Sequence, residues 1–247
     1  MRKIIVLVLI LFVACKQENT TLTAQQIIDK TIIASGADKV TNAQIDFGFR
    51  DKEYAAVRNN GLFKLFRNFE DEKLGMVSDV ISNNGFERTV NGHPLKVPDS
   101  MAVKYTSSVN SVHYFSVLPY GLNDKAVRKK LLPEVEIKSK QYYKVEVSFS
   151  EEGGGEDFED VFIYWIHKTS FKIDYLAYSF HVNGGGKRFR EATNERIVNG
   201  IRFVDYNNYK AKNASTKLIH LDKAFVNNAL IKLSEINLKS VQVELLD

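Results

Sequence analysis

Two glycine triplets come closest, by residue type and spacing, to a site for phosphate chemistry. One triplet occupies residues 153–155 and the other residues 184–186, directly before Lys187 and Arg188. A Walker loop needs its glycine and lysine followed by a serine or threonine, whose hydroxyl binds the magnesium ion of the nucleotide. Because Arg188 stands in that position, the sequence does not support a nucleotide-binding loop.

Both triplets are better explained as turns between strands. A dinucleotide-binding fingerprint spaces its glycines as Gly-x-Gly-x-x-Gly between a strand and a helix, whereas strand-like sequence flanks residues 181–190 on both sides. The acidic run at residues 151–160 lacks the alternating oxygen ligands and closing glutamate of an EF-hand loop. We therefore interpret the triplets as hairpin loops and the acidic run as a solvated surface loop.

Other side chains that perform catalysis or bind metals are scattered along the chain. The five histidines occur singly and are His93, His113, His167, His181 and His220. A zinc site would pair histidines at a short spacing such as His-x-x-x-His, and a serine hydrolase would show a Gly-x-Ser-x-Gly elbow; the sequence has neither. We therefore predict no metal and no other cofactor. A catalytic group assembled from distant residues leaves no linear pattern, so an enzyme stays an alternative.

The amino terminus carries the most specific signal in the sequence. Arg2 and Lys3 precede an unbroken apolar run at residues 4–13, which is too short to cross a bilayer as a helix. Ala14 then stands directly before Cys15, the only cysteine of the chain. This arrangement resembles the lipobox of bacterial lipoproteins, which implies cleavage before Cys15 and attachment of the lipid to it. The alternative is an ordinary secretory signal with a cysteine at this place by chance.

Lipidation divides the chain into three expected parts. Residues 1–14 form a lipoprotein signal peptide, residues 15–21 a short lipidated tether, and residues 22–247 a single domain. Several acyl chains hold a protein on a membrane because each buried methylene contributes about 0.8 kcal/mol. We therefore expect an outer-membrane lipoprotein, on the periplasmic face or at the cell surface, with the membrane as a partner through its lipid anchor.

Charge and composition argue against nucleic acid as a partner and favour a sheet-rich fold. Removal of residues 1–14 leaves 32 basic and 30 acidic side chains, a balance without the electrostatic footprint of a nucleic-acid-binding protein. The 16 phenylalanines and 11 tyrosines fall mostly within strand-like runs, as in a sheet with a large apolar face. With Cys15 acylated no disulfide can form, so the fold must depend on a hydrophobic core.

Helical periodicity gives way to strand periodicity near the start of the mature chain. Thr23 and Gln26 form a capping box for a helix that we expect Gly36 to end in the left-handed conformation. From Ala43 onward apolar and polar residues alternate in successive runs, the last at residues 201–210, and Asn-Gly pairs separate several of them. The sequence predicts a long antiparallel meander.

Three stretches depart from this alternation. Residues 161–166 and 175–180 are apolar at successive positions, so we expect central strands that are covered on both faces or border a cavity. Residues 100–132 lose the strand pattern. We predict a helical insertion there, with two helices broken at Pro119 and the second capped by Asn123.

Residues 161–203 carry a series of strands and turns with a recognisable order. Trp165-Ile166-His167-Lys168-Thr169 ends one strand, residues 183–186 occupy a hairpin, and Asn199-Gly200-Ile201 a later turn. This series resembles the second half of the carriers that sort lipoproteins to the outer membrane, the Lol family. In that family an aspartate stands where this chain has His167.

Further motifs extend a likeness over nearly the whole mature chain. They are Asn110-Ser111-Val112, Tyr114-Phe115, Leu118-Pro119-Tyr120, residues 173–178 and residues 184–190. In these the chain is similar to a group of uncharacterised Bacteroidetes lipoproteins. The resemblance implies an α+β fold like that of the lipoprotein carriers, with a curved antiparallel sheet, or incomplete β-barrel, wrapped around helices and enclosing an apolar cavity.

We expect a membrane-tethered envelope lipoprotein that binds or carries a lipid or a lipid-anchored molecule in an apolar groove. The helices at residues 100–132 would cover the groove, and apolar strand residues would line it. The candidate lining residues are Phe47, Phe49, Phe66, Val145, Val147, Trp165 and Phe203. Each of these positions also suits an ordinary core, because apolar strand faces usually pack against one another.

Two alternatives from other classes stay open. One is an envelope hydrolase or isomerase that uses polar groups in the same cavity, for which a histidine and a carboxylate would meet inside it. The other is a structural or sensory lipoprotein that binds a protein partner through an exposed apolar patch.

Overall fold

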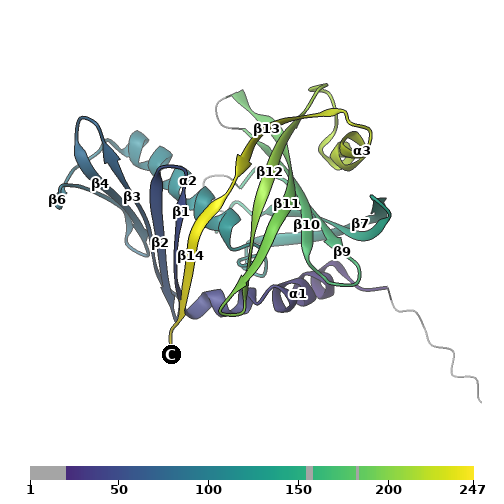
Figure 1. Ribbon diagram of the computed structural model, residues 1–247, viewed down its shortest axis with the longest axis horizontal. Coiled ribbons are helices and arrows are strands. Elements are labelled where there is room, and N and C mark those ends of the chain that lie inside the picture. Colours follow the sequence, from purple (N-terminus) through teal and green to yellow (C-terminus); the bar gives the residue numbers. More distant parts are fainter. Residues whose placement is uncertain (1–20, 154–157, 182–183) are drawn as a thin grey trace, which may run out of the picture.

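Strand-forming sequence dominates the protein. Its structure, a computed structural model, describes residues 21–153, 158–181 and 184–247. Residues 1–20, with the predicted signal peptide, Cys15 and nearly all of the tether, lie outside these ranges. Over the described residues the chain forms two antiparallel sheets of seven strands, neither closed into a barrel, and a few helices (Figure 1). The predicted α+β fold built on open antiparallel sheet is confirmed.

Both sheets are meanders in which most strands pair with their neighbours in sequence. Sheet A has the order β14-β1-β2-β3-β4-β5-β6, and sheet B the order β13-β12-β11-β10-β9-β8-β7. The strands of sheet A are β1 (Ala43–Phe49), β2 (Lys52–Asn59), β3 (Leu62–Asp71), β4 (Gly75–Ser82), β5 (Gly85–Val90), β6 (His93–Pro94) and β14 (Leu238–Leu245). The strands of sheet B are β7 (Val127–Ile137), β8 (Lys140–Phe149), β9 (Phe162–His167), β10 (Ile173–Phe180), β11 (Gly186–Val198), β12 (Ile201–Ala211) and β13 (Leu230–Ile236).

Left-handed turn residues close the hairpins where the sequence predicts them. Asn60 and Gly61, between β2 and β3, have φ angles of 51° and 83°. A two-residue type I′ turn needs positive φ at both positions, which asparagine and glycine tolerate best. Phe180 of β10 pairs with Gly186 of β11, so the second glycine triplet belongs to a hairpin, as predicted.

The helices of the described chain are α1 (Ala24–Ala34), α2 (Asp99–Ser116) and α3 (Leu221–Val226), with short 3-10 segments at Ala37–Asn42 and Leu218–His220. The capping box between Thr23 and Gln26 is present, and Gly36 follows α1 with a φ of 61°. The start and the end of α1 are therefore as predicted. None of the described helices is both long and apolar enough to span a bilayer.

Only the first of the two helices predicted at residues 100–132 is present. α2 ends at Ser116, and β7 begins at Val127. Within β7, Val127 and Leu131 lie opposite residues of β8 in a continuous antiparallel ladder. The prediction of a second helix, capped by Asn123, is therefore wrong. Val127 and Leu131 are spaced for a strand face as well as for a helix face, and pairing with β8 decides between the two.

Sheet B is covered on both faces, as its doubly apolar central strands require. α1 packs on one of them, which we call the inner face, through residues such as Ile27. α3 packs on the opposite face, where the rings of Phe225 and Phe189 are 4.9 Å apart. The apolar stretches at residues 161–166 and 175–180 coincide with β9 and β10, in the interior of this sheet.

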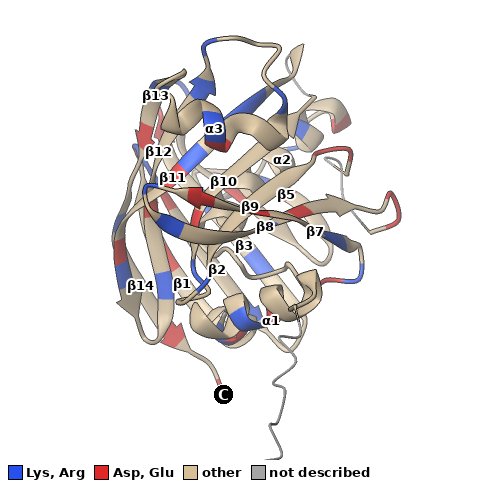
Figure 2. Ribbon diagram, turned by 90° about the vertical axis from the view of Figure 1, so that its right-hand side faces the viewer, with Lys and Arg blue, Asp and Glu red and all other residues tan. Residues whose placement is uncertain are grey.

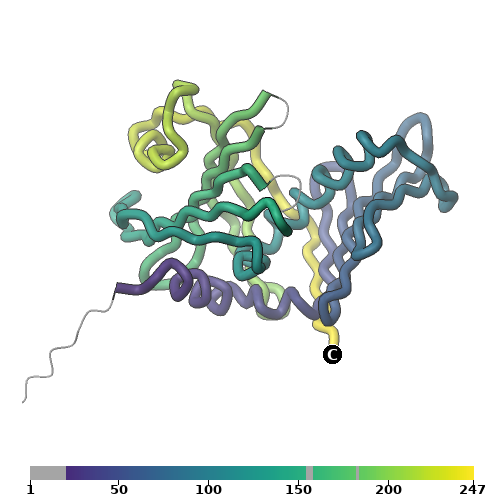
Figure 3. The backbone as a smooth tube through the Cα atoms, turned by 180° about the vertical axis from the view of Figure 1, so that it is seen from behind, coloured from purple at the N-terminus to yellow at the C-terminus, as the bar shows by residue number. Residues whose placement is uncertain are grey.

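α2 runs along sheet A and reaches toward sheet B with its carboxyl-terminal end (Figures 1 and 3). A buried polar layer joins the helix to β3, β4 and β5. Asp79 accepts hydrogen bonds from Arg67 (2.5 Å) and Arg88 (2.6 Å), and Arg67 also donates to Ser108 of α2 (2.7 Å). Arg67, fixed by Asp79, thereby links α2 to sheet A through a charge-assisted bond.

The chain passes from sheet B to sheet A at a single residue, Asn237, between β13 and β14. Asp205 of β12 accepts the backbone N–H of Leu238 (2.9 Å) and a hydrogen bond from Arg196 (3.1 Å). Arg196 donates in turn to the carbonyl of Leu238 (2.9 Å). We call this arrangement the corner. β13 and β14 lie beyond the last strand predicted from the sequence.

Replacement of Asp205 with alanine should lower the free energy of unfolding by about 2–3 kcal/mol, because it leaves the partly buried N–H of Leu238 without its acceptor and removes the carboxylate that pairs with Arg196. Urea denaturation at neutral pH measures the change. Glu235→Ala, which removes an exposed ion pair with Lys232 on β13, is the control and should leave the unfolding curve unchanged. Equal effects of the two substitutions would contradict a special role for Asp205.

Candidate functional site

A buried arginine lies on the inner face of sheet B. Arg190 belongs to β11 and is 8% exposed. Its guanidinium stacks over the ring of Phe115 at 3.8 Å, and its Nη2 donates to the hydroxyl of Tyr178 (3.0 Å). Its Nε–H is buried without a partner. Because an unpaired buried donor costs about 1–3 kcal/mol, Arg190 is a candidate for ligand binding.

No described carboxylate pairs with Arg190. Burial lowers its pKa, the hydroxyls of Tyr178 and Tyr206 offset part of that effect, and the charge of Arg188 adds to it. Arg188 lies two positions earlier on the same face of β11; it stacks over Phe180 (4.9 Å) and donates to a backbone carbonyl. Along the strands drawn in Figure 2, by contrast, the positions of basic and acidic residues are interspersed. The inner end of β11 is therefore locally positive.

Aromatic rings surround this positive site. We define the inner aromatic cluster as Tyr114, Phe115, Phe149, Phe162, Tyr164 and Tyr178. Phe162 lies at its centre, with ring centroids 5.4 to 6.1 Å from the other five. Phe115, Phe149 and Tyr178 are half-buried, so the cluster continues from the core to the surface.

The two tyrosines at the buried end of the cluster, Tyr114 and Tyr164, are neutral. The hydroxyls of Tyr114 and Tyr164 are 2.8 Å apart and satisfy each other. Burial raises the pKa of Tyr114 and Tyr164 far above the usual value, and it raises the pKa of Tyr206 beside them. The rings therefore provide apolar surface and neutral hydrogen-bonding groups without a negative charge to balance Arg190.

The seven residues predicted to line a groove lie at four separate places in the structure. Phe47, Phe49 and Phe203 meet in a cluster between β1 and β12, and Val145 and Val147 lie on the inner face of sheet B. Trp165 is on the opposite face of sheet B, where it donates to Asp222 (3.1 Å). Phe66 lies on β3, next to the buried Arg67 and Leu65, so its side chain points to the other face of sheet A.

The structure thus brings only Val145 and Val147 near the inner aromatic cluster. Sequence reasoning missed Arg190, Phe115 and Phe162 as site residues. Aromatic density around β9 and β10 was the available signal, but a strand arginine is ordinarily interpreted as solvent-exposed.

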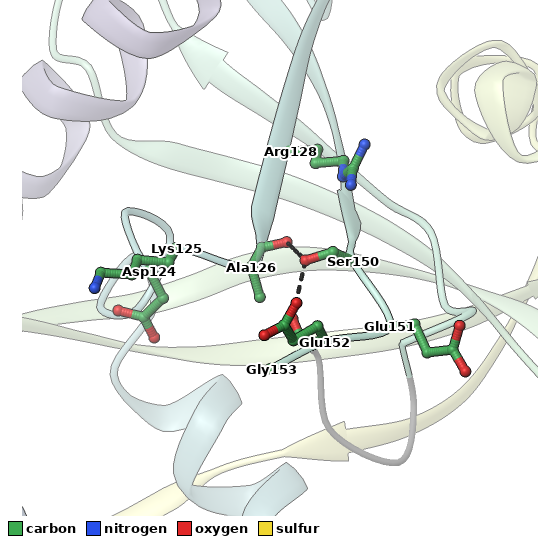
Figure 4. Close-up of a pocket in the computed structure, with 8 residues that line it drawn as sticks. All are labelled: Asp124, Lys125, Ala126, Arg128, Ser150, Glu151, Glu152 and Gly153. Carbon is green, nitrogen blue, oxygen red and sulfur yellow. Dashed lines mark hydrogen bonds between the residues drawn. The ribbon is translucent and has the colours of Figure 1, made fainter.

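Beyond Phe149, at the end of β8, lies an open polar hollow of about 1070 Å³ (Figure 4). Its lining residues are Asp124, Lys125, Ala126, Arg128, Ser150, Glu151, Glu152 and Gly153. Ser150 donates to the carbonyls of Ala126 (3.3 Å) and Glu152 (3.1 Å), so its hydroxyl is engaged with the backbone. The hollow shows no activated nucleophile among these residues.

A second polar hollow, of about 270 Å³, lies on the outside of sheet B. Two of its carboxylates are held by lysines outside it, Glu191 by Lys138 (2.8 Å) and Glu195 by Lys172. Hydrogen-bonded ion pairs of this kind keep a carboxylate ionised and occupied.

Within the described ranges no group of three or more histidine, cysteine or acidic residues is arranged to hold a metal ion.

His113, one of the histidines considered for catalysis, is enclosed between α2 and sheet A. It is 1% exposed and its Nε2–H donates to the carbonyl of Phe66 (3.0 Å), which leaves Nδ1 buried without a partner. Burial lowers the pKa of His113 to about 4. A histidine does meet a carboxylate at His181 and Asp160 (3.4 Å), where the imidazole is exposed.

The buried neutral His113 makes stability depend on pH. Between pH 6.5 and 4 the unfolded chain binds a proton that the folded chain excludes, so the free energy of unfolding should fall as pH falls, by about 2 kcal/mol from pH 7 to pH 5. Urea denaturation at both pH values measures it. His113→Phe should flatten this dependence, whereas His93→Gln, at an exposed position, should retain it. An unchanged slope in His113→Phe would refute the assignment.

Structural comparison finds solved structures that resemble this chain at very low sequence identity. A DUF1329 family protein from Desulfovibrio piger matches with a TM-score of 0.50 and 7% identity, over 90% of this chain and 93% of that one. A putative outer membrane lipoprotein-sorting protein domain from Vibrio parahaemolyticus matches with 0.47 and 7%, over 90% and 93%. Lipoprotein LppX from Mycobacterium tuberculosis matches with 0.29 and 8%, over 64% and 89%. The first likeness extends to the fold alone.

Sequence comparison gives one family. None of the curated proteins compared with the chain matches it. A family model described as a family of unknown function, DUF6503, matches residues 2–237. Since the match covers nearly the whole sequence, the chain belongs to the DUF6503 family.

Proposed function

We propose that the protein is an envelope lipoprotein, anchored through Cys15 in the outer membrane, that binds a lipid or a lipid-anchored molecule at the inner aromatic cluster. The observation that carries the proposal is this cluster, which leads from the core of sheet B to half-buried Phe115, Phe149 and Tyr178. Such a surface takes up acyl chains by partition, with little directional hydrogen bonding. The sequence resemblance to the Lol carriers implies a cargo of the same kind.

Uptake requires room, and the arrangement of α2 offers a way to provide it. α2 is joined to sheet A by the packing of Val109 and by the bond to Ser108 from Arg67, which Asp79 holds in place. Tyr114 and Phe115, in contrast, meet sheet B mainly through rings. Separation of apolar rings is compensated when acyl chains replace them. Sheet A with α2 would therefore move as a unit about the corner, and the cluster would open between α2 and sheet B.

A tryptophan at position 115 should report on a bound chain. In Phe115→Trp, a brominated fatty acid should quench the added fluorescence strongly. The wild type is the matched control, because its only tryptophan, Trp165, lies on the opposite face of sheet B. Fluorescence titration of the chain from residue 21 onward measures both. Equal quenching in the two proteins, or none, would refute binding at the cluster.

The anchor is tested separately. In a host that processes bacterial lipoproteins, labelled palmitate should be incorporated into the full-length wild type and not into Cys15→Ala, because no other cysteine is available. Fractionation should place the wild type with the outer membrane. Label in both proteins, or in neither, would refute lipidation of Cys15.

A further inference from the structure

We propose that the ligand of the inner aromatic cluster is an anionic amphiphile, whose carboxylate or phosphate oxygen binds the guanidinium of Arg190 while its acyl chain lies among the rings. This inference rests on the proposed function and adds the class of headgroup to it. It is carried by the pattern of paired and unpaired charges inside the protein.

Four of the five other buried cations in the described chain have carboxylate partners. Arg67 and Arg88 share Asp79, Lys144 binds Asp222 (2.8 Å), and Arg202 binds Glu195 (2.7 Å). Arg190 departs from this pattern, as Arg58 of sheet A does, because its described contacts are rings and the hydroxyl of Tyr178. A buried cation without a counterion is costly unless something else neutralises it.

The atoms around Arg190 fit an oxyanion. The stacked guanidinium presents its Nε–H edge without a partner, and Tyr178, whose oxygen accepts from Nη2, keeps its own O–H to donate. Arg188 lies on the same face toward the end of the sheet and raises the local positive potential. An anion bound here would relieve the repulsion between the two arginines and gain charge-assisted hydrogen bonds.

A second unpaired atom lies beside the first. Asn208 is directly opposite Arg190 across β11 and β12, and its Oδ1 is buried without a partner. The site thus offers unpaired donors and one unpaired acceptor. A phosphomonoester with a neighbouring hydroxyl can use both, whereas a fatty acid carboxylate uses only the donors.

One other buried arginine resembles Arg190 and supplies a matched control. Arg58 of β2 has Nη1 buried without a partner and stacks over Tyr120 at 5.2 Å. It belongs to sheet A and lies outside the inner aromatic cluster. Arg58→Gln therefore removes a buried cation of the same kind without touching the proposed headgroup site.

Binding of four probes, each below its critical micelle concentration, tests the inference with the chain from residue 21 onward, which contains every described element. The probes are oleate, oleoyl lysophosphatidate, oleyl alcohol and inorganic phosphate, titrated by calorimetry. The wild type and Arg58→Gln should bind at least one anionic amphiphile at least tenfold more tightly than the alcohol. Arg190→Gln should lose this preference while still binding the alcohol.

Each other outcome is decisive. Equal affinity for the alcohol and the anions would overturn the inference and leave the proposed function standing, whereas binding of no amphiphile would overturn both. Phosphate bound as tightly as lysophosphatidate would indicate a free-anion site and refute the amphiphile. If Arg190→Gln does not fold by circular dichroism, Arg190→Lys and Tyr178→Phe replace it, and an unchanged anion preference in both would refute the headgroup contact.

Discussion

The position of Asp205 is the constraint on which the arrangement of the two sheets depends. β13 and β14 are separated by one residue, yet one completes sheet B and the other completes sheet A. A strand can change partners within so short a span only if its backbone groups are satisfied at the bend. Asp205 and Arg196 provide this by binding the N–H and the carbonyl of Leu238. The carboxyl-terminal strands thereby join two meanders that are otherwise built from local hairpins.

The joined sheets explain why the interior has two different chemistries. α2 meets sheet A through a polar layer, in which Asp79 is engaged by two arginines, beside an apolar cluster that includes Val109. The end of α2 meets sheet B through aromatic rings. Ionic hydrogen bonds are directional and resist sliding, but ring contacts can be exchanged for acyl chains at little cost. The contacts of α2 with sheet A are therefore fixed, whereas acyl chains can replace its ring contacts with sheet B. A binding cleft that opens on one side of a helix requires this difference.

Local sequence signals determined much of this architecture, and long-range pairing determined the rest. The capping box of Thr23, the Asn-Gly turns and the doubly apolar β9 and β10 could be predicted because each depends on residues close in sequence. β7 could not, since Val127 and Leu131 fit two periodicities until β8 is placed beside them. β13 is mostly exposed and mixes charged with apolar residues, so it lacks the alternation by which buried strands are recognised. In β14, Val241, Val243 and Leu245 do alternate with polar residues, but the partner strand β1 lies near the other end of the chain.

The position of Arg190 shows the same limit for the site. Its face on β11 follows from alternation, but its burial follows from Phe115, which is 75 positions away in the sequence and arrives only when α2 crosses toward sheet B. Once there, the ring stacks on the guanidinium, and the resulting burial lowers the pKa of Arg190 and leaves Nε unpaired. A bound oxyanion would reverse both effects, because it restores the pKa and occupies the donor. Binding of an anion would therefore offset the free energy that the burial of Arg190 costs the unliganded protein. A neutral ligand would not offset it, so the site would favour ligands with negative charge.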